Sequence, residues 1–252
     1  MKHYIDLNCD MGESFGAWTM GHDQDVMPWV SSVNIACGFH AGDPATMRRT
    51  VALALEHGVR VGAHPGLPDL AGFGRRVMAV TPQDAYDLVV VQVGALAAVA
   101  RSQGGSLHHV KAHGALYNMA ARDPALAQAV ARAVADVDPG LVLYALAGSV
   151  QVQAGLDAGL AVAQEVFADR SYQPDGSLTP RQQPGAMITD AEQSVRQVLQ
   201  MVEQGQVTCL SGELVELKAD TLCLHGDQPD AADFARRLHA AFQERGIGVQ
   251  AV

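Results

Sequence analysis

The stretch from Ser32 to Ala63, SVNIACGFHAGDPATMRRTVALALEHGVRVGA, contains the pattern that repeats along this chain. Its two ends, Ser32–Ala36 and Val59–Ala63, are short runs of β-type residues. The segment between them has a helical period, with an apolar stripe at Met47, Val51, Ala54 and Leu55 and charges on the other face at Arg48, Arg49 and Glu56. A strand, a helix and a second strand in this order predict two parallel strands joined by a crossover helix.

The same alternation continues through the chain. Candidate strands are Tyr4–Leu7, Ser32–Ala36, Val59–Ala63, Leu107–Ala112, Leu141–Leu146, Ala161–Ala168 and Thr221–Leu224. A second helical stripe follows a capping box at Thr189–Glu192 and ends before Gly205. About seven strands that alternate with helices favour a barrel over an open sheet. We therefore predict an α/β fold, a single TIM-like (β/α) barrel, seven-stranded or irregular, that forms one domain over residues 1–252.

Two segments interrupt the alternation. Phe167–Met187 contains three prolines and two glycines and has no helical stripe, which is typical of a functional loop such as a lid. Val207–Leu217 has the pattern of a β-hairpin with its turn at Ser211-Gly212. A last helix is predicted to begin after Pro229.

The composition restricts the class of protein. The 252 residues are 48% hydrophobic and 17% charged, which suits a large core and excludes a disordered chain. The net charge of −10 argues against a nucleic-acid-binding face and against docking on anionic lipid. The sequence has no run of about 18 apolar residues and no signal-peptide pattern at its N-terminus. The four cysteines are widely spaced and are expected to be reduced thiols, so we expect a cytoplasmic protein.

Polar side chains follow nearly every predicted strand at its carboxyl end. They are Asn8, Asp10 and Glu13 after the first strand, Asn34, His40 and Asp43 after the second, His64 after the third, Lys111, His113 and Tyr117 after the fourth, Glu165, Asp169 and Arg170 near the end of the sixth, and His225 and Asp227 after the last. In a (β/α) barrel these loops open on one face, where active sites are built. Residues far apart in the sequence are therefore expected to meet around one mouth.

Some of these residues also have a purely structural explanation. Asp43 precedes Pro44, and Asp227 precedes the last predicted helix, so each also fits a helix N-cap. Lys111 ends an apolar strand in a chain with three lysines, and a buried lysine needs a partner, which favours a functional role. His108 and His109 alternate along a strand, so at most one points inward, and neither is assigned to the site.

The chain lacks the common catalytic motifs. It has no Gly-x-x-x-x-Gly-Lys-Ser/Thr phosphate loop, no His-Glu-x-x-His and no Gly-x-Ser-x-Gly. The remaining carboxylates, imidazoles and single lysine suit either proton transfer or a divalent metal. Asp10, His40 and His64 come from three successive strand ends and would form a metal triad, although no short-spaced ligand pair supports it. No residue is assigned to a metal on this basis.

Long and unusual sequence blocks lie at the predicted strand ends. They read DLNCDMGE (6–13), NIACGFHAGD (34–43), GAHPGLPD (62–69), VKAHGALY (110–117), EVFADR (165–170), RQQPGA (181–186) and CLHGD (223–227). These blocks resemble those of the LamB/YcsF family, the A subunit of bacterial ATP-dependent 5-oxoprolinase, over almost the whole chain. The resemblance implies a barrel related to glycoside hydrolases and polysaccharide deacetylases. It also implies cleavage of 5-oxoproline (pyroglutamate) to L-glutamate with ATP hydrolysis, together with subunits B and C.

A mechanistic hypothesis follows from this implied reaction. Amide resonance protects the lactam carbonyl, so phosphorylation of its oxygen would make the ring carbon open to attack by water. Because the chain lacks a phosphate loop, we predict that subunits B and C perform the ATP-dependent step and this chain opens the ring. The predicted catalytic residues are Asp10 or His40 as base and Lys111 with His113 as stabilisers of negative charge. The predicted substrate-binding residues are Asn8, Glu13, Asn34, Asp43, His64, Tyr117, Glu165, Asp169, Arg170, Arg181, His225 and Asp227, with Arg170 or Arg181 clasping a carboxylate or phosphate.

Two alternative functions stay open at this point. One is a metal-dependent deacetylase or sugar amidohydrolase that uses Asp10, His40 and His64. The other is a non-catalytic scaffold for the partner subunits, which would not need so many ionisable groups at one mouth. The sequence leaves open whether ATP or a divalent metal binds this chain.

Overall fold

The computed structural model describes residues 4–225 and 231–252. Within these ranges seven parallel strands form a closed barrel: β1 (Tyr4–Met11), β2 (Ser32–Ala36), β3 (Arg60–His64), β4 (His109–Lys111), β5 (Val142–Leu146), β6 (Ala161–Phe167) and β9 (Thr221–His225). Each strand pairs with the next in this order, and β9 pairs again with β1, which closes the ring. The predicted TIM-like (β/α) barrel is confirmed. A short strand, β10 (Gly248–Val249), pairs with the start of β1.

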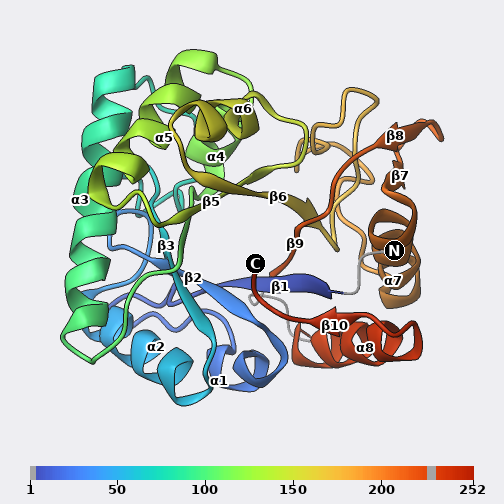
Figure 1. Cartoon of the computed structure of the whole chain (residues 1–252), viewed down its shortest axis with the longest axis horizontal. Coiled ribbons are helices and arrows are strands. Elements are labelled where there is room, and N and C mark those ends of the chain that lie inside the picture. Colours follow the sequence, from blue (N-terminus) through green and yellow to red (C-terminus); the bar gives the residue numbers. More distant parts are fainter. Residues whose placement is uncertain (1–3, 226–230) are drawn as a thin grey trace.

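Helices surround the ring of strands on its outside, as Figure 1 shows. They are α1 (Asp23–Val26), followed by a 3-10 turn at Met27–Trp29, α2 (Pro44–Glu56), α3 (Pro82–Arg101), α4 (Gly114–Ala120), α5 (Pro124–Val137), α6 (Val150–Asp157), α7 (Ala191–Gln204) and α8 (Ala231–Glu244). Their buried side chains are mostly apolar and pack on the outward-facing side chains of the strands. An apolar core therefore fills the space between the barrel and the helices.

Helix α3 is the one helix in the described ranges that is long and apolar enough to cross a membrane, by length and composition alone. It has no unbroken apolar run because Asp84 and Asp87 lie in its first turns. In this fold α3 packs against α5 and β3. Core helices of water-soluble proteins pass the same test, so this property does not assign the helix to a membrane.

The predicted hairpin is confirmed. β7 (Gln206–Thr208) and β8 (Leu214–Glu216) pair in antiparallel fashion, separately from the barrel. Gly212 at the turn has a φ of 91°, a conformation that glycine adopts without strain.

The long loop after β6 contains no helix, as predicted, but it has internal structure. Isolated bridges join Arg170 to Met187 and Tyr172 to Leu178, which fold the loop back on itself. The hydroxyl of Tyr172 also accepts a hydrogen bond from the Phe167 amide at 2.8 Å. The loop is therefore held in place at the carboxyl end of β6.

The first predicted strand is too short. β1 continues to Met11, so Asn8 and Asp10 lie inside the strand and not in the loop after it. Their side chains are stabilised by hydrogen bonds across the interior of the barrel, for example from Asn34 to both of them (2.7 and 2.8 Å). A search for apolar runs ends such a strand early because it counts inward polar residues as loop.

The predicted start of α7 is also wrong by one residue. Asp190 is the N-cap, and its carboxylate accepts a hydrogen bond from the Gln193 amide at 2.6 Å. The predicted end is confirmed, since Gly205 follows α7 in the left-handed conformation. The predicted helix start at Pro229 lies outside the described residues.

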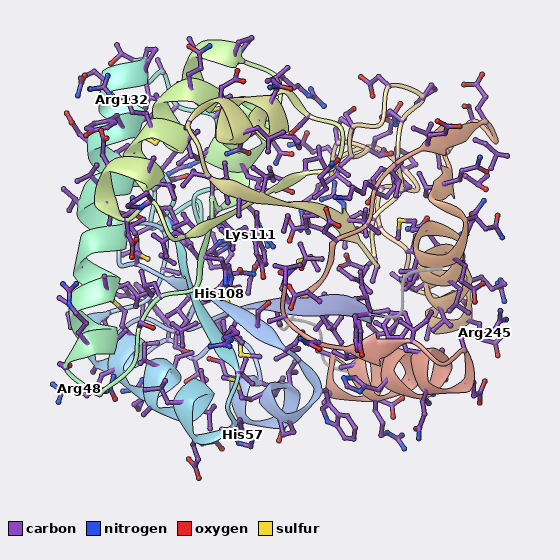
Figure 2. All side chains as sticks on the ribbon, viewed as in Figure 1. Arg48, His57, His108, Lys111, Arg132 and Arg245 are labelled. Atoms are coloured by element: carbon purple, nitrogen blue, oxygen red, sulfur yellow. The ribbon has the colours of Figure 1, made fainter. Side chains whose placement is uncertain are left out.

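The interior of the barrel is polar, in contrast to the surrounding core. Figure 2 shows Lys111 in the middle of the ring, whereas Arg48, Arg132 and Arg245 lie on its outer side. Side chains alternate along a strand, so β1 directs every second residue into the barrel. The residues that meet there are Asp6, Asn8, Asp10, Ser32, Asn34, His109, Lys111, Glu165 and Thr221.

Candidate active site

Hydrogen bonds fill the part of the barrel interior that lies nearer the amino ends of the strands. We call it the interior network, and it consists of Asp6, Asn8, Ser32, Asn34, His109 and Thr221. Asp6 accepts hydrogen bonds from the Ser32 hydroxyl at 2.9 Å and the Thr221 hydroxyl at 2.5 Å. Burial raises the pKa of Asp6, and these hydroxyl groups counteract part of that rise.

His109 and Asn34 close the network on the other side. The Nε2 atom of His109 lies 2.7 Å from the Asn34 side-chain oxygen, and the Asn34 amide donates to the Asn8 side-chain oxygen at 2.7 Å. The imidazole of His109 stacks on the Tyr144 ring with centroids 4.0 Å apart. Such shared hydrogen bonds offset the cost of burying polar groups in the barrel.

Lys111 stands between this network and the mouth of the barrel. Its Nζ atom lies 2.8 Å from Glu165 Oε1 and 3.0 Å from Asp10 Oδ1. Burial works against its charged form, but Asp10, Cys223 and Glu165 hold the pKa of Lys111 well above its usual value. Tyr117 donates a hydrogen bond to the other oxygen of Glu165 at 2.6 Å. Lys111 is therefore a fixed ammonium group at the mouth.

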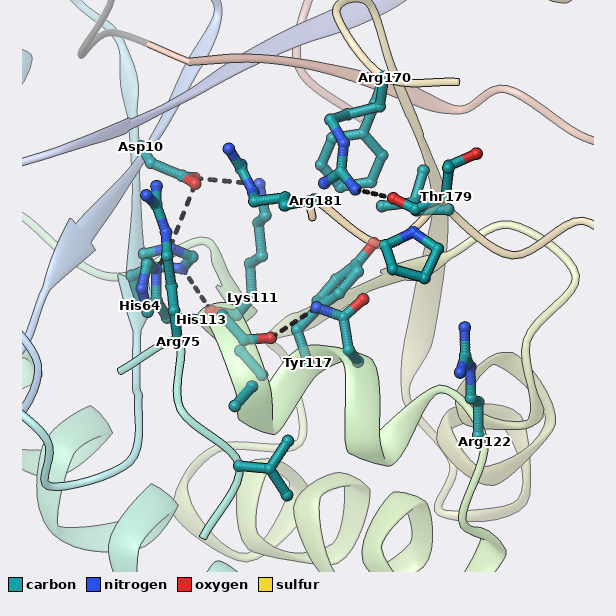
Figure 3. A pocket seen from close by; sticks show the side chains of 18 of the residues that line it. Asp10, His64, Arg75, Lys111, His113, Tyr117, Arg122, Arg170, Thr179 and Arg181 are labelled. Carbon is teal, nitrogen blue, oxygen red and sulfur yellow. Dashed lines mark hydrogen bonds and ion pairs between the residues drawn. The ribbon is translucent and has the colours of Figure 1, made fainter. Parts of the chain in front are cut away.

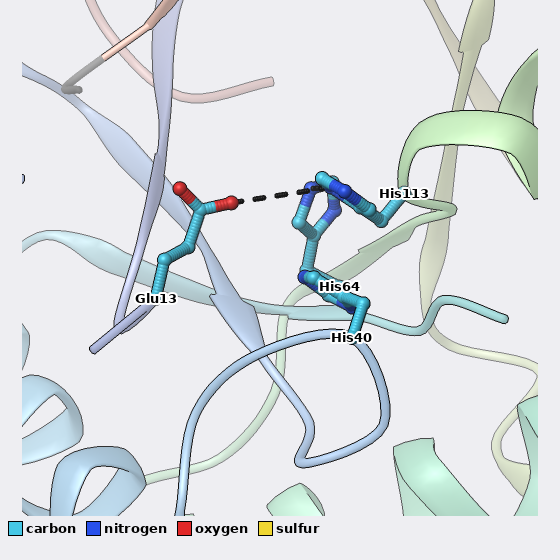
Figure 4. A group of neighbouring side chains, drawn as sticks. All are labelled: Glu13, His40, His64 and His113. Atoms are coloured by element: carbon cyan, nitrogen blue, oxygen red, sulfur yellow. Dashed lines mark hydrogen bonds and ion pairs between the residues drawn. The ribbon is translucent and has the colours of Figure 1, made fainter. Parts of the chain in front are cut away.

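Next to Lys111 lies a group of side chains that we call the histidine cluster: Glu13, His40, His64 and His113. Figure 4 shows the four side chains together, and their candidate ligand atoms all lie within 4.8 Å of one another. His64 Nε2 lies 2.9 Å from His113 Nδ1 and 3.3 Å from Asp10 Oδ2. Glu13 Oε1 lies 3.9 Å from His113 Nδ1.

His40 occupies the innermost position of the cluster. Its ring is fully buried and stacks on His113 with centroids 3.8 Å apart. Glycine at position 66 is required there, because a Cβ atom on Gly66 would lie 2.5 Å from His40 Nδ1. Burial, together with the neighbouring His113 and His64, lowers the pKa of His40 well below its usual value. Burial and then His64 likewise lower the pKa of His113.

A pocket of about 430 Å³ opens at the carboxyl ends of the strands. Its base is lined by Asp10, Glu13, His64, Lys111 and His113. Figure 3 shows Asp10, His64, Lys111 and His113 close together, at the ends of three different strands. Its walls contain four arginines, namely Arg75, Arg122, Arg170 and Arg181. Because the cations outnumber the two carboxylates, the pocket favours an anionic ligand.

The long loop after β6 forms one wall of this pocket through residues 178–182. Arg170 is buried and donates hydrogen bonds to the Thr179 oxygen at 2.5 Å and the Ala186 oxygen at 3.4 Å, so it fastens the loop from within. Burial and the nearby Arg181 lower the pKa of Arg170 to about 10. Arg181 lies exposed at the rim, which makes its guanidinium the more accessible of the two.

The structure brings many of the predicted site residues to one place. Those that line the pocket are Asp10, Glu13, His64, Lys111, His113, Tyr117, Arg170 and Arg181. Asn8, Asn34 and Glu165 lie below it and hold Asp10 or Lys111 by hydrogen bonds. His40 lies behind His113 and does not line the pocket.

Two predicted substrate-binding residues, Asp43 and Asp169, do not line the pocket. Asp43 is the N-cap of α2 and accepts hydrogen bonds from the amides of Thr46 and Gly16, both at 2.8 Å. These bonds lower the pKa of Asp43. Asp169 is buried and does not line the pocket. Asp227 and the side chain of His225 are outside the described residues.

Sequence reasoning missed several residues. The alternation of two adjacent histidines does not tell which one points inward, yet His109 lies two positions before Lys111 and so shares the inward face of β4. Arg75 and Arg122 also line the pocket, from the loop after β3 and the segment after α4. Arg75 belongs to the polar residues that follow the third predicted strand, but neither arginine was assigned to the site, because loop conformation decides which exposed arginines reach the rim.

A closed (β/α) barrel with a polar pocket at the carboxyl ends of its strands is the construction of a barrel enzyme. The sequence matches the LamB/YcsF family over residues 5–252, and the chain belongs to this family. It is 66% identical over 251 residues to the A subunit of 5-oxoprolinase from Bordetella parapertussis, with each chain covered completely. It is 61% identical to the corresponding 5-oxoprolinase chain of Tolumonas auensis, covering 98% of this chain and 99% of that protein.

A solved structure supports the same relationship. The crystal structure of a lactam utilization protein from Thermus thermophilus superposes with a TM-score of 0.93 and is 49% identical, covering 99% of this chain and 100% of that one. The barrel described above is therefore the fold of this relative as well.

Proposed function

We propose that this chain is the A subunit of an ATP-dependent 5-oxoprolinase, which converts 5-oxoproline (pyroglutamate) to L-glutamate. The observation that carries the proposal is the pocket in which Asp10, Lys111 and His113 face an arginine-rich wall. The similarity of the whole chain to proteins named as the A subunit of 5-oxoprolinase supports the choice of substrate. The arginines suit the carboxylate of 5-oxoproline and a phosphate attached to it.

The ATP-dependent step belongs to partner subunits B and C in this proposal. The chain has no phosphate loop, and its pocket residues are those of a hydrolytic site. Phosphorylation of the lactam oxygen by the partners would deliver an activated ring to this pocket. Water then adds to the ring carbon, and cleavage of the C–N bond with a proton delivered to nitrogen leaves an acyl phosphate. A second water hydrolyses this acyl phosphate to glutamate and phosphate.

The positions of the side chains support different roles for them. Asp10 lines the pocket and serves as the base for the attacking water, whereas His40 is sealed behind His113. Lys111 is held as an ammonium group and stabilises negative charge on the reacting carbonyl oxygen or phosphate. Arg181 at the rim binds the anionic end of the substrate, while Arg170 positions the loop that carries it.

The experiment is an assay of glutamate release from 5-oxoproline by this chain alone and with subunits B and C, each with and without ATP. We expect glutamate only from the complete set with ATP. Asp10→Asn in the complete set should lower the rate by about 10²–10⁴-fold, the usual contribution of a general base. An Asp10→Asn enzyme with a normal rate would refute the role of this residue, and no glutamate from the complete set would refute the function.

The histidine cluster favours a second candidate, a metal-dependent amidohydrolase or deacetylase that acts without ATP. The same assay separates the two functions. Hydrolysis of an amide or an acetylated sugar by this chain alone, independent of ATP and the partners, would support the second candidate. The cytoplasmic location expected from the sequence stays a prediction in either case.

A further inference from the structure

The histidine cluster contains a hydrogen-bonding conflict. His64 Nδ1 lies 2.7 Å from the Lys111 carbonyl oxygen, and His113 Nε2 lies 2.8 Å from the Phe73 carbonyl oxygen. A carbonyl oxygen only accepts, so each of these ring nitrogens carries the hydrogen. When both rings are neutral, the remaining nitrogens, His64 Nε2 and His113 Nδ1, are both acceptors, and they face each other at 2.9 Å.

Two facing lone pairs need a positive species between or beside them. A backbone carbonyl bonded to the far nitrogen is the arrangement that orients a metal-binding histidine and fixes its tautomer. Both histidines have this arrangement, and both are buried. The two histidines therefore resemble a pair of metal ligands whose outer hydrogen-bond acceptors, the carbonyl oxygens of Lys111 and Phe73, are already in place.

Two further donors complete the set. Glu13 Oε1 lies 3.9 Å from His113 Nδ1. His40 is fully buried, and neither of its ring nitrogens has a hydrogen-bond partner among the described residues. Burying an imidazole without a hydrogen-bond partner costs stability, so a purely structural role does not explain His40. Its ring nitrogens are available as ligands for a metal ion. The group differs from the triad considered from the sequence, since Glu13 and His113 join His40 and His64, and Asp10 lies beside it.

We propose that Glu13, His40, His64 and His113 form a binding site for one divalent transition metal ion, with His64 Nε2 and His113 Nδ1 as its central ligands. Imidazole and carboxylate donors in a four-ligand set favour Zn²⁺ or a similar ion over Mg²⁺ or Ca²⁺, which prefer oxygen alone. His64, His113 and Glu13 line the base of the pocket, so the ion would be reached from it. The binding site does not depend on the proposed function. A role for the ion in activating the attacking water does rest on that function.

The test measures metal binding by the full chain, independently of any activity. The protein is purified without chelator and its metal content is determined by mass spectrometry. It is then stripped and titrated with Zn²⁺ by calorimetry and with Co²⁺ by visible absorption. We expect about one ion per chain, with Co²⁺ bands typical of nitrogen and oxygen ligands. No saturable binding of either ion to the wild-type chain would overturn the proposal.

Variants locate the site. His64→Gln and His113→Gln should abolish binding, and His57→Gln, an exposed histidine on the outside of the barrel, should leave it unchanged. Glu13 is only half-buried, so Glu13→Gln should fold normally and weaken binding by about tenfold or more, at least the cost of losing an outer-shell partner. Melting curves of each variant without metal show whether it has folded. Full binding by folded His113→Gln and Glu13→Gln proteins would place the ion elsewhere and contradict the assignment.

Failure of this proposal and failure of the proposed function give different results. Glutamate release by a chain that binds no metal would contradict the metal site and leave the function standing. Metal binding at the cluster without glutamate release from the complete set would confirm the site and contradict the function.

Discussion

The interior network and the histidine cluster are both buried and polar, but they differ in how their hydrogen bonds are arranged. In the interior network His109 Nε2 faces the Asn34 oxygen, an acceptor that its hydrogen can satisfy. In the cluster, His64 Nε2 faces His113 Nδ1, and the other nitrogen of each ring is already bound to a carbonyl. The first arrangement stabilises the barrel. His109 Nδ1 also lies near a histidine nitrogen, His108 Nδ1, but at a longer 3.3 Å and on a ring that is only half-buried. The cluster instead combines its buried pair with Glu13 and His40, which gives it the donors of a binding site.

Lys111 lies between the two regions, and its removal should have the largest effect. Lys111→Met leaves Asp10 and Glu165 without the ammonium group that they share. Breaking a buried ion pair costs about 3–5 kcal/mol, so we expect a loss of this size in the free energy of unfolding together with loss of activity. Urea unfolding measures it. Lys218→Met is the control, because Lys218 is exposed although its partner Asp220 is half-buried, and it should change stability by less than about 0.5 kcal/mol. Equal stability of the two variants would contradict this account of Lys111.

A variant in the cluster should lose activity and keep its stability. For His113→Gln we expect a rate of glutamate formation about 10²–10⁴-fold lower in the complete enzyme, because its imidazole lines the pocket. The free energy of unfolding should change by less than about 1 kcal/mol in the absence of metal, since glutamine retains a donor for the Phe73 carbonyl. A His113→Gln enzyme with lower stability and an unchanged rate would contradict the assignment of activity to the cluster and of stability to the interior network.

A variant in the interior network should show the opposite behaviour. Asn34→Leu is close in size, but it leaves His109 Nε2 without its acceptor and removes one of the hydrogen bonds to the Asn8 oxygen. An unsatisfied buried polar group costs about 1–3 kcal/mol, so we expect unfolding to become easier by at least that amount. Metal binding should be unchanged, because Asn34 does not belong to the cluster. Loss of metal binding in a folded Asn34→Leu protein would show that the two regions are one unit.

The pH dependence of stability sharpens the same comparison. Burial, followed by the nearby charges, lowers the pKa of His109 well below its usual value, so it stays neutral in the folded chain when the unfolded chain takes up a proton. Stability therefore rises with pH and is lost as pH falls below about 6.5, by up to about 1.4 kcal/mol per pH unit for this histidine. Unfolding measured with chelator at several pH values should show a shallower slope for His109→Gln than for wild type or His57→Gln. An unchanged slope would contradict a neutral His109.

The smallest effect is expected at the rim of the pocket. Arg181 is exposed, so Arg181→Ala should raise KM about fivefold, equivalent to about 1 kcal/mol, with kcat unchanged. Steady-state kinetics of the complete enzyme measure this change, with Arg48→Ala on the outer face of α2 as the control. A drop in kcat instead would mean that Arg181 acts on the reacting atoms.

Much of the fold was predictable from the sequence because helix and strand periods are local properties. The strand at Ser32–Ala36 has the predicted bounds, and the helix after it begins at the predicted Asp43-Pro44 pair. The error at β1 arose because its inward residues are polar, so the rule that finds apolar runs stopped at Leu7. Inward polar residues are stabilised only by partners on other strands, and these are invisible to a local pattern.

The location of the site was predictable from the sequence, but the arrangement of its side chains was not. The sequence alone determined the strand and helix alternation, and with it the meeting of Asp10, His64, Lys111 and His113 at one mouth, because parallel strands in a barrel end on the same face. Only the tertiary structure decided that His40 lies behind His113, that Arg170 fastens a loop, and that two histidine acceptors face each other. These depend on side-chain directions and loop paths set by long-range packing, to which local sequence periodicity gives no access.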